Sequence, residues 1–336
     1  MRIAHLCSAH GFGHLTRQLA VAEELRGMGA EPVLFTAAPA SVVEEYLPGT
    51  AVVPWRIDVG ICQPDSLTED IPATLTALEA ACSEARIDAL ADALRGFDRA
   101  VVDIAPVAME AARRAGVPVI AAGNFDWPWI YRHYPALHGF ADRLAAMQAP
   151  HRALFLTPGP GLFGFHDVTT LPLVGRRRPA APLPPRTVLV SFGGFGLDAV
   201  ADVLPEIPGV TWATSPPMLD LDRPDSLHLD APYPALVAGA DAVLTKPGYG
   251  IHAECALAGT PMVWVERGAF PEAPHLIAAM SQRGAPVGCG PGEPAFPSRL
   301  AAALEVVFSR PPPEPVSSEG AAQAARAILA TPAGWR

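Results

Sequence analysis

The sequence has no long hydrophobic run, although half of its 336 residues are hydrophobic. Its apolar runs are short, and none approaches the ~20 residues that a membrane-spanning helix needs. The first residues enter a strand-like pattern at once, without the charged and then apolar regions of a signal peptide. We therefore expect a cytoplasmic protein that is not integral to a membrane.

Cysteine is scarce, and positive charge is in deficit. The five cysteines are scattered and include no Cys-x-x-Cys pair, which indicates reduced thiols. No His, Cys and Asp cluster has metal-ligand spacing, so no metal site is expected. The formal net charge of -10 argues against nucleic acid as a partner. A nucleotide remains possible as a ligand, because backbone amides and a few cations neutralise one diphosphate.

Strand-like and helix-like segments alternate along the chain, which predicts doubly wound parallel sheets. The length suits two domains better than one core. We predict an α/β fold of two Rossmann-like domains, at 1–158 and 187–319, joined by a Pro-, Gly- and Arg-rich linker at 159–186. The last segment, 320–336, is expected to pack back on the first domain. In the first domain one long helix is predicted over 73–95.

The most informative stretch, residues 246–275, predicts a ligand site. A glycine-containing turn with Gly248 and Gly250 leads into a short helix that carries Glu254. Amides at a helix N-terminus suit a phosphate, and a carboxylate one turn further on suits the paired hydroxyls of a ribose. A nucleoside diphosphate satisfies both. The alternative is that Glu254 is an ordinary helical glutamate facing solvent.

A second glycine loop, Gly11-Phe12-Gly13-His14, follows the first strand and opens a helix. Thr16 stands where the third glycine of a dinucleotide fingerprint belongs, which argues against NAD. The glycines let the backbone approach a sugar, and His14 can take a proton from a hydroxyl. His10 could replace His14 as the base, and His14 could instead cap the helix.

Three further groups of residues have both a functional and a structural interpretation. Asp103 ends the strand predicted over 99–104, and it either orients His14 or caps the next helix. Asn124, Asp126 and Trp127 form a polar and aromatic cluster that could bind a sugar or fill the core. The glycine loop with Gly193 and Gly194 could hold a diphosphate or simply make a tight turn.

Two separated runs resemble GT-B glycosyltransferases, which are two-domain enzymes that use nucleotide sugars. The run at 246–261 is similar to the donor motif of the bacterial lipid-intermediate N-acetylglucosaminyltransferase, in which a glutamate binds the ribose. The Lys-x-Gly-Tyr-Gly run and the Asn-Phe-x-Trp-x-x-Ile-Tyr run at 124–131 resemble the glycosyltransferase-like half of L-arabinokinases. The Gly-x-Gly-His loop is similar to the acceptor-side loop of GT-B enzymes. With Arg17 it also resembles the Gly-x-Gly-His-x-x-Arg of a UDP-sugar hydrolase.

The resemblance implies a role for each candidate residue in a GT-B fold whose domains face a central cleft. His14 and Asp103 would be catalytic. The other expected sites are the donor nucleotide, at Gly193, Gly194, Lys246, Gly248, Tyr249, Gly250, His252 and Glu254; the donor sugar, at Glu266, Arg267 and Glu272; and the acceptor, at His10, Gly11, Gly13, Asn124, Asp126 and Trp127. The chain lacks the Asp-Gln or Glu-Gln pair with which many relatives hold the sugar, so the resemblance leaves the sugar open.

The expected function is inverting, metal-independent transfer by a hexosyltransferase-type enzyme. The sugar would move from a UDP or dTDP sugar to a hydroxyl of a small molecule, a glycan or a lipid. No cofactor is expected beside the nucleotide-sugar co-substrate. Two alternatives stay open, which are a nucleotide-sugar hydrolase or epimerase on the same scaffold and a non-catalytic protein that binds nucleotide sugars.

Overall fold

The computed structural model describes residues 1–63, 69–192, 200, 202–216, 220–266 and 270–331. Within them the chain forms two compact α/β units. The first unit is discontinuous in sequence: it contains residues 1–63 and 69–174 and also residues 319–331. The second contains the described residues between 175 and 318. None of the described helices is both long and apolar enough to cross a membrane.

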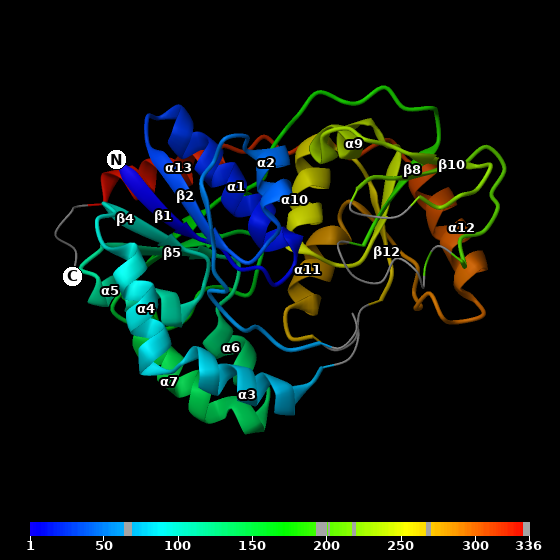
Figure 1. The fold of residues 1–336 in the computed structure, drawn as a ribbon. Coiled ribbons are helices and arrows are strands. Elements are labelled where there is room, and N and C mark those ends of the chain that lie inside the picture. Colours follow the sequence, from blue (N-terminus) through cyan, green and yellow to red (C-terminus); the bar gives the residue numbers. More distant parts are fainter. Residues whose placement is uncertain (64–68, 193–199, 201, 217–219, 267–269, 332–336) are drawn as a thin grey trace. The chain divides into compact units, whose positions relative to one another are not determined.

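A seven-stranded parallel sheet forms the centre of the first unit, in the order β3-β2-β1-β4-β5-β6-β7. Figure 1 labels β2, β1, β4 and β5 of this sheet. Its strands are β1 (Arg2–Leu6), β2 (Glu31–Thr36), β3 (Val52–Pro54), β4 (Arg99–Val102), β5 (Val119–Gly123), β6 (Arg152–Leu156) and β7 (Asp167–Leu171). The strands β4 and β5 are buried along their whole length, as in a parallel sheet that helices cover on both faces. The strand order reverses between β1 and β4, and ligands of such sheets bind at the carboxyl ends of the strands at that point.

The helices of the first unit include one from the far end of the chain. They are α1 (Phe12–Gly27), α2 (Ala40–Tyr46), α3 (Ile71–Ala81), α4 (Glu84–Leu94), α5 (Pro106–Arg114), α6 (Trp127–Tyr131), α7 (His138–Gln148) and α13 (Gly320–Ala330), with a 3-10 turn η1 (Pro135–Leu137). α13 packs against α1 (Figure 1). Its Ile328 joins a buried cluster with Ile3 and Val21. The buried Arg99 also donates to the carbonyls of Ile328 (2.9 Å) and Leu329 (2.7 Å).

Two sequence predictions are wrong in the first unit. The single helix predicted over 73–95 is divided into α3 and α4, because Ser83 adopts an extended conformation and starts a new helix. The predicted linker at 159–186 contains β7, the edge strand of the sheet, in which Arg152 of β6 pairs with Asp167. The β-branched residues Val168, Thr169 and Thr170 favour a strand there.

The second unit is built on a six-stranded parallel sheet in the order β10-β9-β8-β11-β12-β13. The strands are β8 (Thr187–Ser191), β9 (Thr211–Thr214), β10 (Ser226–His228), β11 (Ala242–Thr245), β12 (Met262–Trp264) and β13 (Gly284–Pro286). The helices are α9 (Tyr233–Gly239), α10 (Tyr249–Ala258), α11 (Ala273–Met280) and α12 (Phe296–Phe308). Buried clusters around Trp212 and Trp264 hold helices to the sheet. Here the strand order reverses between β8 and β11, and α10 follows β11 directly.

Candidate active site

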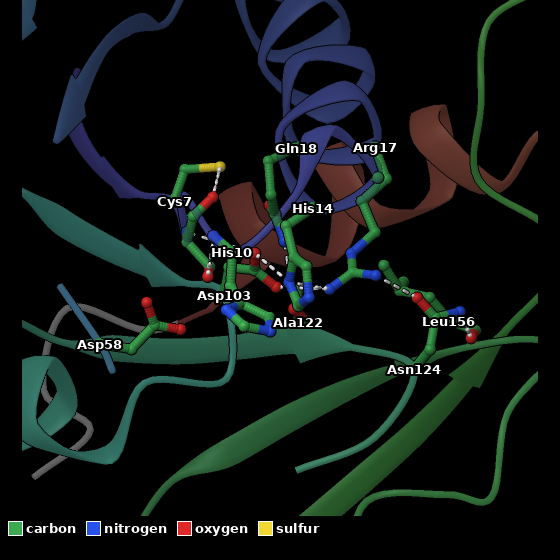
Figure 2. A network of polar contacts seen from close by, with 12 residues as sticks. Cys7, His10, His14, Arg17, Gln18, Asp58, Asp103, Ala122, Asn124 and Leu156 are labelled. Carbon is green, nitrogen blue, oxygen red and sulfur yellow. Dashed lines mark hydrogen bonds and ion pairs between the residues drawn. The ribbon is translucent and has the colours of Figure 1, made fainter. Parts of the chain in front are cut away.

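His14 and Asp103 meet where the strand order of the first sheet reverses. His14 lies in the first turn of α1, after β1, and Asp103 directly follows β4. The amide of Asp103 donates to the carbonyl of Leu6 (2.8 Å), which continues the β1–β4 pairing. Nδ1 of His14 is 2.8 Å from Oδ2 of Asp103 (Figure 2). Neither side chain caps a helix, because Gly11 is the N-cap of α1 and Ala105 that of α5.

A strained turn holds the Asp103 carboxylate in place. The amide of Ile104 donates to the carbonyl of Val102 (2.9 Å), so Asp103 sits at the apex of a tight turn. Ile104 has a φ of 46°, a region that β-branched residues rarely enter. The carboxylate of Asp103 is completely buried, and a carboxylate there needs strong partners.

Arg17 is the strongest of those partners, although no role for it was predicted from the sequence. One turn after His14 on α1, its Nη2 donates to Oδ1 of Asp103 (2.7 Å) and lies 2.7 Å from Nδ1 of His14 (Figure 2). Its Nη1 donates to Oδ1 of Asn124 (2.6 Å). Burial tends to raise the pKa of Asp103, but Arg17 and His14 bring it down to about 2. The i, i+3 spacing of His14 and Arg17 on a helix was the available signal.

Asp58 is a second residue that sequence reasoning missed. It lies in the loop after β3, where its Oδ2 accepts a hydrogen bond from Nε1 of Trp127 (2.9 Å). Burial raises the pKa of its carboxyl, while nearby His14 and a hydrogen bond from Ser8 act in the opposite direction. Trp127 itself is buried and stacks parallel to the His14 ring at 6.3 Å. No periodic pattern marks this loop, so nothing in the local sequence points to Asp58.

The residues expected at the acceptor site have different surroundings. His10 packs edge-on against Trp127 with its ring beside Gly60, and Gly11 has a φ of 92°, which favours glycine. Gly13 lies within α1. Asp126 is fully buried and caps α6, with its two oxygens accepting from the amides of Trp129 (2.9 Å) and Phe163 (2.7 Å). Asn124 is buried, and its side-chain Nδ2 donates hydrogen bonds to the carbonyls of Leu156 and Pro158. Its amide oxygen accepts from Nη1 of Arg17.

The second candidate site lies at α10 in the second unit. Gly248 is the N-cap, and Tyr249 and Gly250 form the first turn of the helix. Glu254 is one turn after Gly250, on the same side of the helix. His252 is two residues from Glu254 and hence points to another side. Lys246 is half-buried in the turn before the helix.

Glu254 is a buried acid with an unusual environment. Only 4% of the residue is exposed, and its Oε1 is 3.7 Å from Nη2 of the buried Arg176. Among the described residues, its Oε2 and Nδ1 of His252 have no hydrogen-bond partner. Burial raises the pKa of the Glu254 carboxyl to about 7, against the effect of Arg176 and Arg178. Burial also lowers the pKa of His252 to about 4.

The remaining donor-site predictions are only partly within the described chain. Gly193, Gly194 and Arg267 lie outside the described residues. Glu266 is exposed after β12, and Glu272 is buried at the N-cap of α11. At the end of β8, the Ser191 hydroxyl is hydrogen-bonded to the Tyr233 hydroxyl.

Within the described ranges, no group of three or more His, Cys, Asp or Glu side chains is arranged to hold a metal ion. The sequence does contain one Asp-x-Asp, Asp220-Leu221-Asp222, a pattern that holds manganese in GT-A enzymes. Here both aspartates are exposed, and Oδ1 of Asp220 accepts from the amide of Asp222 (3.1 Å). The pair forms a local turn in the second unit.

Comparison with solved structures decides the fold. Three similar structures are the glycosyltransferase of kitacinnamycin (19% identity, TM-score 0.62, covering 97% of this chain and 95% of that one), VinC in complex with dTDP (18%, 0.57, 99% and 96%) and Arabidopsis thaliana UGT89C1 complexed with quercetin (14%, 0.63, 98% and 94%). The fold is GT-B. The fold class and the resemblance predicted from sequence are thus confirmed.

Sequence comparison finds a more specific likeness to part of a larger protein. The chain is 30% identical over 301 residues to an L-arabinokinase of Arabidopsis thaliana. The match covers 81% of this chain but only 29% of the arabinokinase. No family model matches the chain.

Proposed function

We propose that this GT-B chain transfers a sugar from a nucleoside diphosphate sugar to an acceptor hydroxyl, with inversion and without a metal ion. The single observation that carries the proposal is the His14–Asp103 pair at the carboxyl ends of β1 and β4. The donor would be a UDP or dTDP sugar, and the acceptor a small molecule, a glycan or a lipid. No cofactor beside the nucleotide sugar is proposed.

The chemistry assigned to the first unit is general-base catalysis. Nε2 of His14 takes the proton of the acceptor hydroxyl while the hydroxyl oxygen attacks the anomeric carbon. The bond from that carbon to the diphosphate oxygen breaks, and the nucleoside diphosphate leaves with the electron pair. Asp103 holds the imidazole in the required orientation through Nδ1 and stabilises its positive charge, as the carboxylate of a serine protease triad does.

The chemistry assigned to the second unit is donor binding at α10. The N-terminus of α10, beside Lys246, suits the diphosphate, on which negative charge grows as the bond breaks. The buried Oε2 of Glu254 has no described partner, and a ribose hydroxyl would supply one. A buried acceptor without a donor is unfavourable in the free protein, which supports a ligand at this position.

Nucleotide binding tests the donor assignment. Titration calorimetry with UDP, dTDP, GDP and ADP should show binding of at least one nucleotide, weakened by about 1–3 kcal/mol in Glu254→Ala. Glu206→Ala, which changes an exposed glutamate of the same unit, is the matched control and should bind like the wild type. If no nucleotide binds, the donor site is wrongly assigned.

Turnover measurements distinguish sugar transfer from hydrolysis and from binding without catalysis. With the donor class known, nucleotide release is measured with and without a panel of hydroxyl acceptors, in the wild type and in His14→Ala. Transfer predicts acceptor-dependent release that falls by about 100-fold or more without the base. A second candidate, nucleotide-sugar hydrolysis, is favoured by the contact of Arg17 with His14, since Gly-x-Gly-His-x-x-Arg resembles a UDP-sugar hydrolase. Free sugar released without an acceptor would identify it, and binding without any turnover would identify a non-catalytic protein.

A further inference from the structure

Nδ1 of His14 faces two charged partners that it cannot satisfy together. Oδ2 of Asp103 lies 2.8 Å away and Nη2 of Arg17 2.7 Å away (Figure 2). A protonated Nδ1 donates to Asp103 and brings two donors face to face at Arg17. A bare Nδ1 accepts from Arg17 and brings two acceptors face to face at Asp103. The imidazole nitrogen carries one proton or none, so only one contact is a hydrogen bond at a time.

The two contacts correspond to opposite chemical forms of His14. In the neutral ring, a proton on Nδ1 leaves Nε2 bare and able to accept a proton. A bare Nδ1 places the proton on Nε2, which then acts only as a donor. The partner that wins at Nδ1 therefore determines whether His14 is a base.

Both competitors keep their charge at neutral pH. An arginine guanidinium does not lose its proton in proteins. Asp103 is ionised there, because Arg17 and His14 hold its pKa at about 2 despite its burial. Other groups near His14 are Asp58, from the loop after β3, and the neutral Asn124 and Trp127, after β5. Of these charged groups, only Asp103 and Arg17 contact Nδ1 in the described structure.

The position of Arg17 is fixed from its other side. Nη1 donates to Asn124, whose own amide group is held by the carbonyls of Leu156 and Pro158. Nη2 also donates to Oδ1 of Asp103 (2.7 Å). The guanidinium is thus held by residues that follow β4 and β5, and only 3% of Arg17 is exposed. It cannot move away from His14 without breaking buried hydrogen bonds.

We propose that Arg17 is a positioning residue that competes with Asp103 for Nδ1 of His14 and biases the free protein toward the tautomer with its proton on Nε2. The inference rests on the proposed role of His14 as the base. Arg17 then holds part of the protein in a form in which His14 cannot accept the acceptor's proton. Removal of the guanidinium should favour the Nδ1–H tautomer.

The decisive experiment reads the tautomer directly, without substrate. The full chain is labelled with 15N-histidine, and the signals of His14 are assigned by their loss in His14→Gln. In the wild type at pH 8, the 15N chemical shifts should show that a substantial fraction of the molecules has no proton on Nδ1 of His14. Arg17→Met, of similar length but uncharged, should move the shifts toward Nδ1–H. Arg26→Met, an exposed arginine on the same helix, should leave them unchanged.

A second variant keeps the test decisive if Arg17→Met does not fold. Arg17→Lys keeps the positive charge but has one terminal nitrogen, which cannot contact Asp103, Asn124 and His14 together as the guanidinium does. This variant should therefore also shift the tautomer of His14 toward the form with its proton on Nδ1. Unchanged His14 shifts in a folded Arg17 variant would overturn the inference, because a purely structural arginine would not alter the tautomer.

If the tautomer moves but no nucleotide sugar is turned over, the proposed function fails and the competition at Nδ1 stands.

Discussion

At the scale of single residues, two buried carboxyl groups have pKa values that are shifted in opposite directions. Glu254 is buried with a distant cation, and its pKa is raised to about 7. Asp103 is buried in direct contact with Arg17 and His14, and its pKa is lowered to about 2. The difference follows from how close the cationic partners lie, because Arg17 and His14 contact Asp103 at 2.7–2.8 Å and add hydrogen bonds, whereas Arg176 is 3.7 Å from Glu254.

Glu254 should make stability depend on pH near neutrality. Because its pKa is raised in the folded state, the folded protein binds more protons than the unfolded chain between about pH 4.5 and pH 7. The contribution of Glu254 to the free energy of unfolding therefore falls as pH rises through this window, by up to about 3 kcal/mol. Urea unfolding at several pH values should show this fall in the wild type and its loss in Glu254→Gln. Glu206→Gln, the exposed control, should keep the wild-type dependence.

Asp103 should behave in the opposite way. Its contribution to stability is fully present above about pH 3.8 and is lost as pH falls toward 2. At pH 7, Asp103→Asn leaves the guanidinium of Arg17 buried without its counter-charge, which should lower the free energy of unfolding by about 3–5 kcal/mol. Asp92→Asn, at a surface pair on α4, should change it by less than about 1 kcal/mol. A similar small loss for both variants would contradict the buried ion pair.

How far the sequence predicts the site depends on where each residue lies. His14 and Asp103 follow buried strands, and the sheet topology brings the carboxyl ends of β1 and β4 together. Asp126 resembles a ligand residue in sequence, but the Pro at the second position of α6 after Trp127 was a helix-start signal that favoured a cap. Asp58 could not be found, because only the tertiary fold brings its loop to Trp127.

At the scale of elements, the ends of β4 and β5 are fitted closely to one another. A side chain at Gly123 would overlap with Cγ2 of Ile104, the residue with the strained backbone beside Asp103. Ile104 is fully buried and has little freedom to move away. This fit explains how a turn that ordinary residues avoid is retained at the candidate active site.

Gly123→Ala should therefore destabilise the first unit by about 1–3 kcal/mol, as for overpacking in a core. Thermal and urea unfolding measure the effect. Gly139→Ala is the control, because a side chain there meets nothing within 4 Å, and it should be neutral or slightly stabilising. Combining Gly123→Ala with Ile104→Ala should recover part of the loss beyond additivity, and strict additivity would rule out the overlap.

Element boundaries were predicted less well than element types, for a physical reason. The apolar periodicity of 73–95 continues through the break at Ser83, so only the local backbone conformation reveals two helices. β7 lies at the edge of the sheet among Pro and Gly residues, where alternation is short and composition resembles a loop. Central strands, buried on both faces, carry the clearer signal.

At the scale of the whole molecule, the first unit is completed by a helix that follows the second unit in sequence. Deleting residues 319–336 removes α13, exposes the cluster around Ile3 and Val21, and leaves Arg99 without the carbonyls of Ile328 and Leu329. Hydrogen exchange measured by mass spectrometry should show faster exchange in β1 and β4 of the deletion variant and little change in β8 and β11. Arg99→Met should give a weaker effect of the same kind. Equal loss of protection in both sheets would show that the units do not unfold independently.

The same discontinuity has a consequence for protein synthesis. When a ribosome has made the first sheet, it must still translate residues 175–318 before α13 exists. At 5–20 residues per second this takes roughly 7–30 s. During that interval the apolar side of α1 that α13 later covers is open to water, while the second unit is continuous and can fold as it emerges. The nascent first unit is therefore a candidate client for chaperones until the final helix docks.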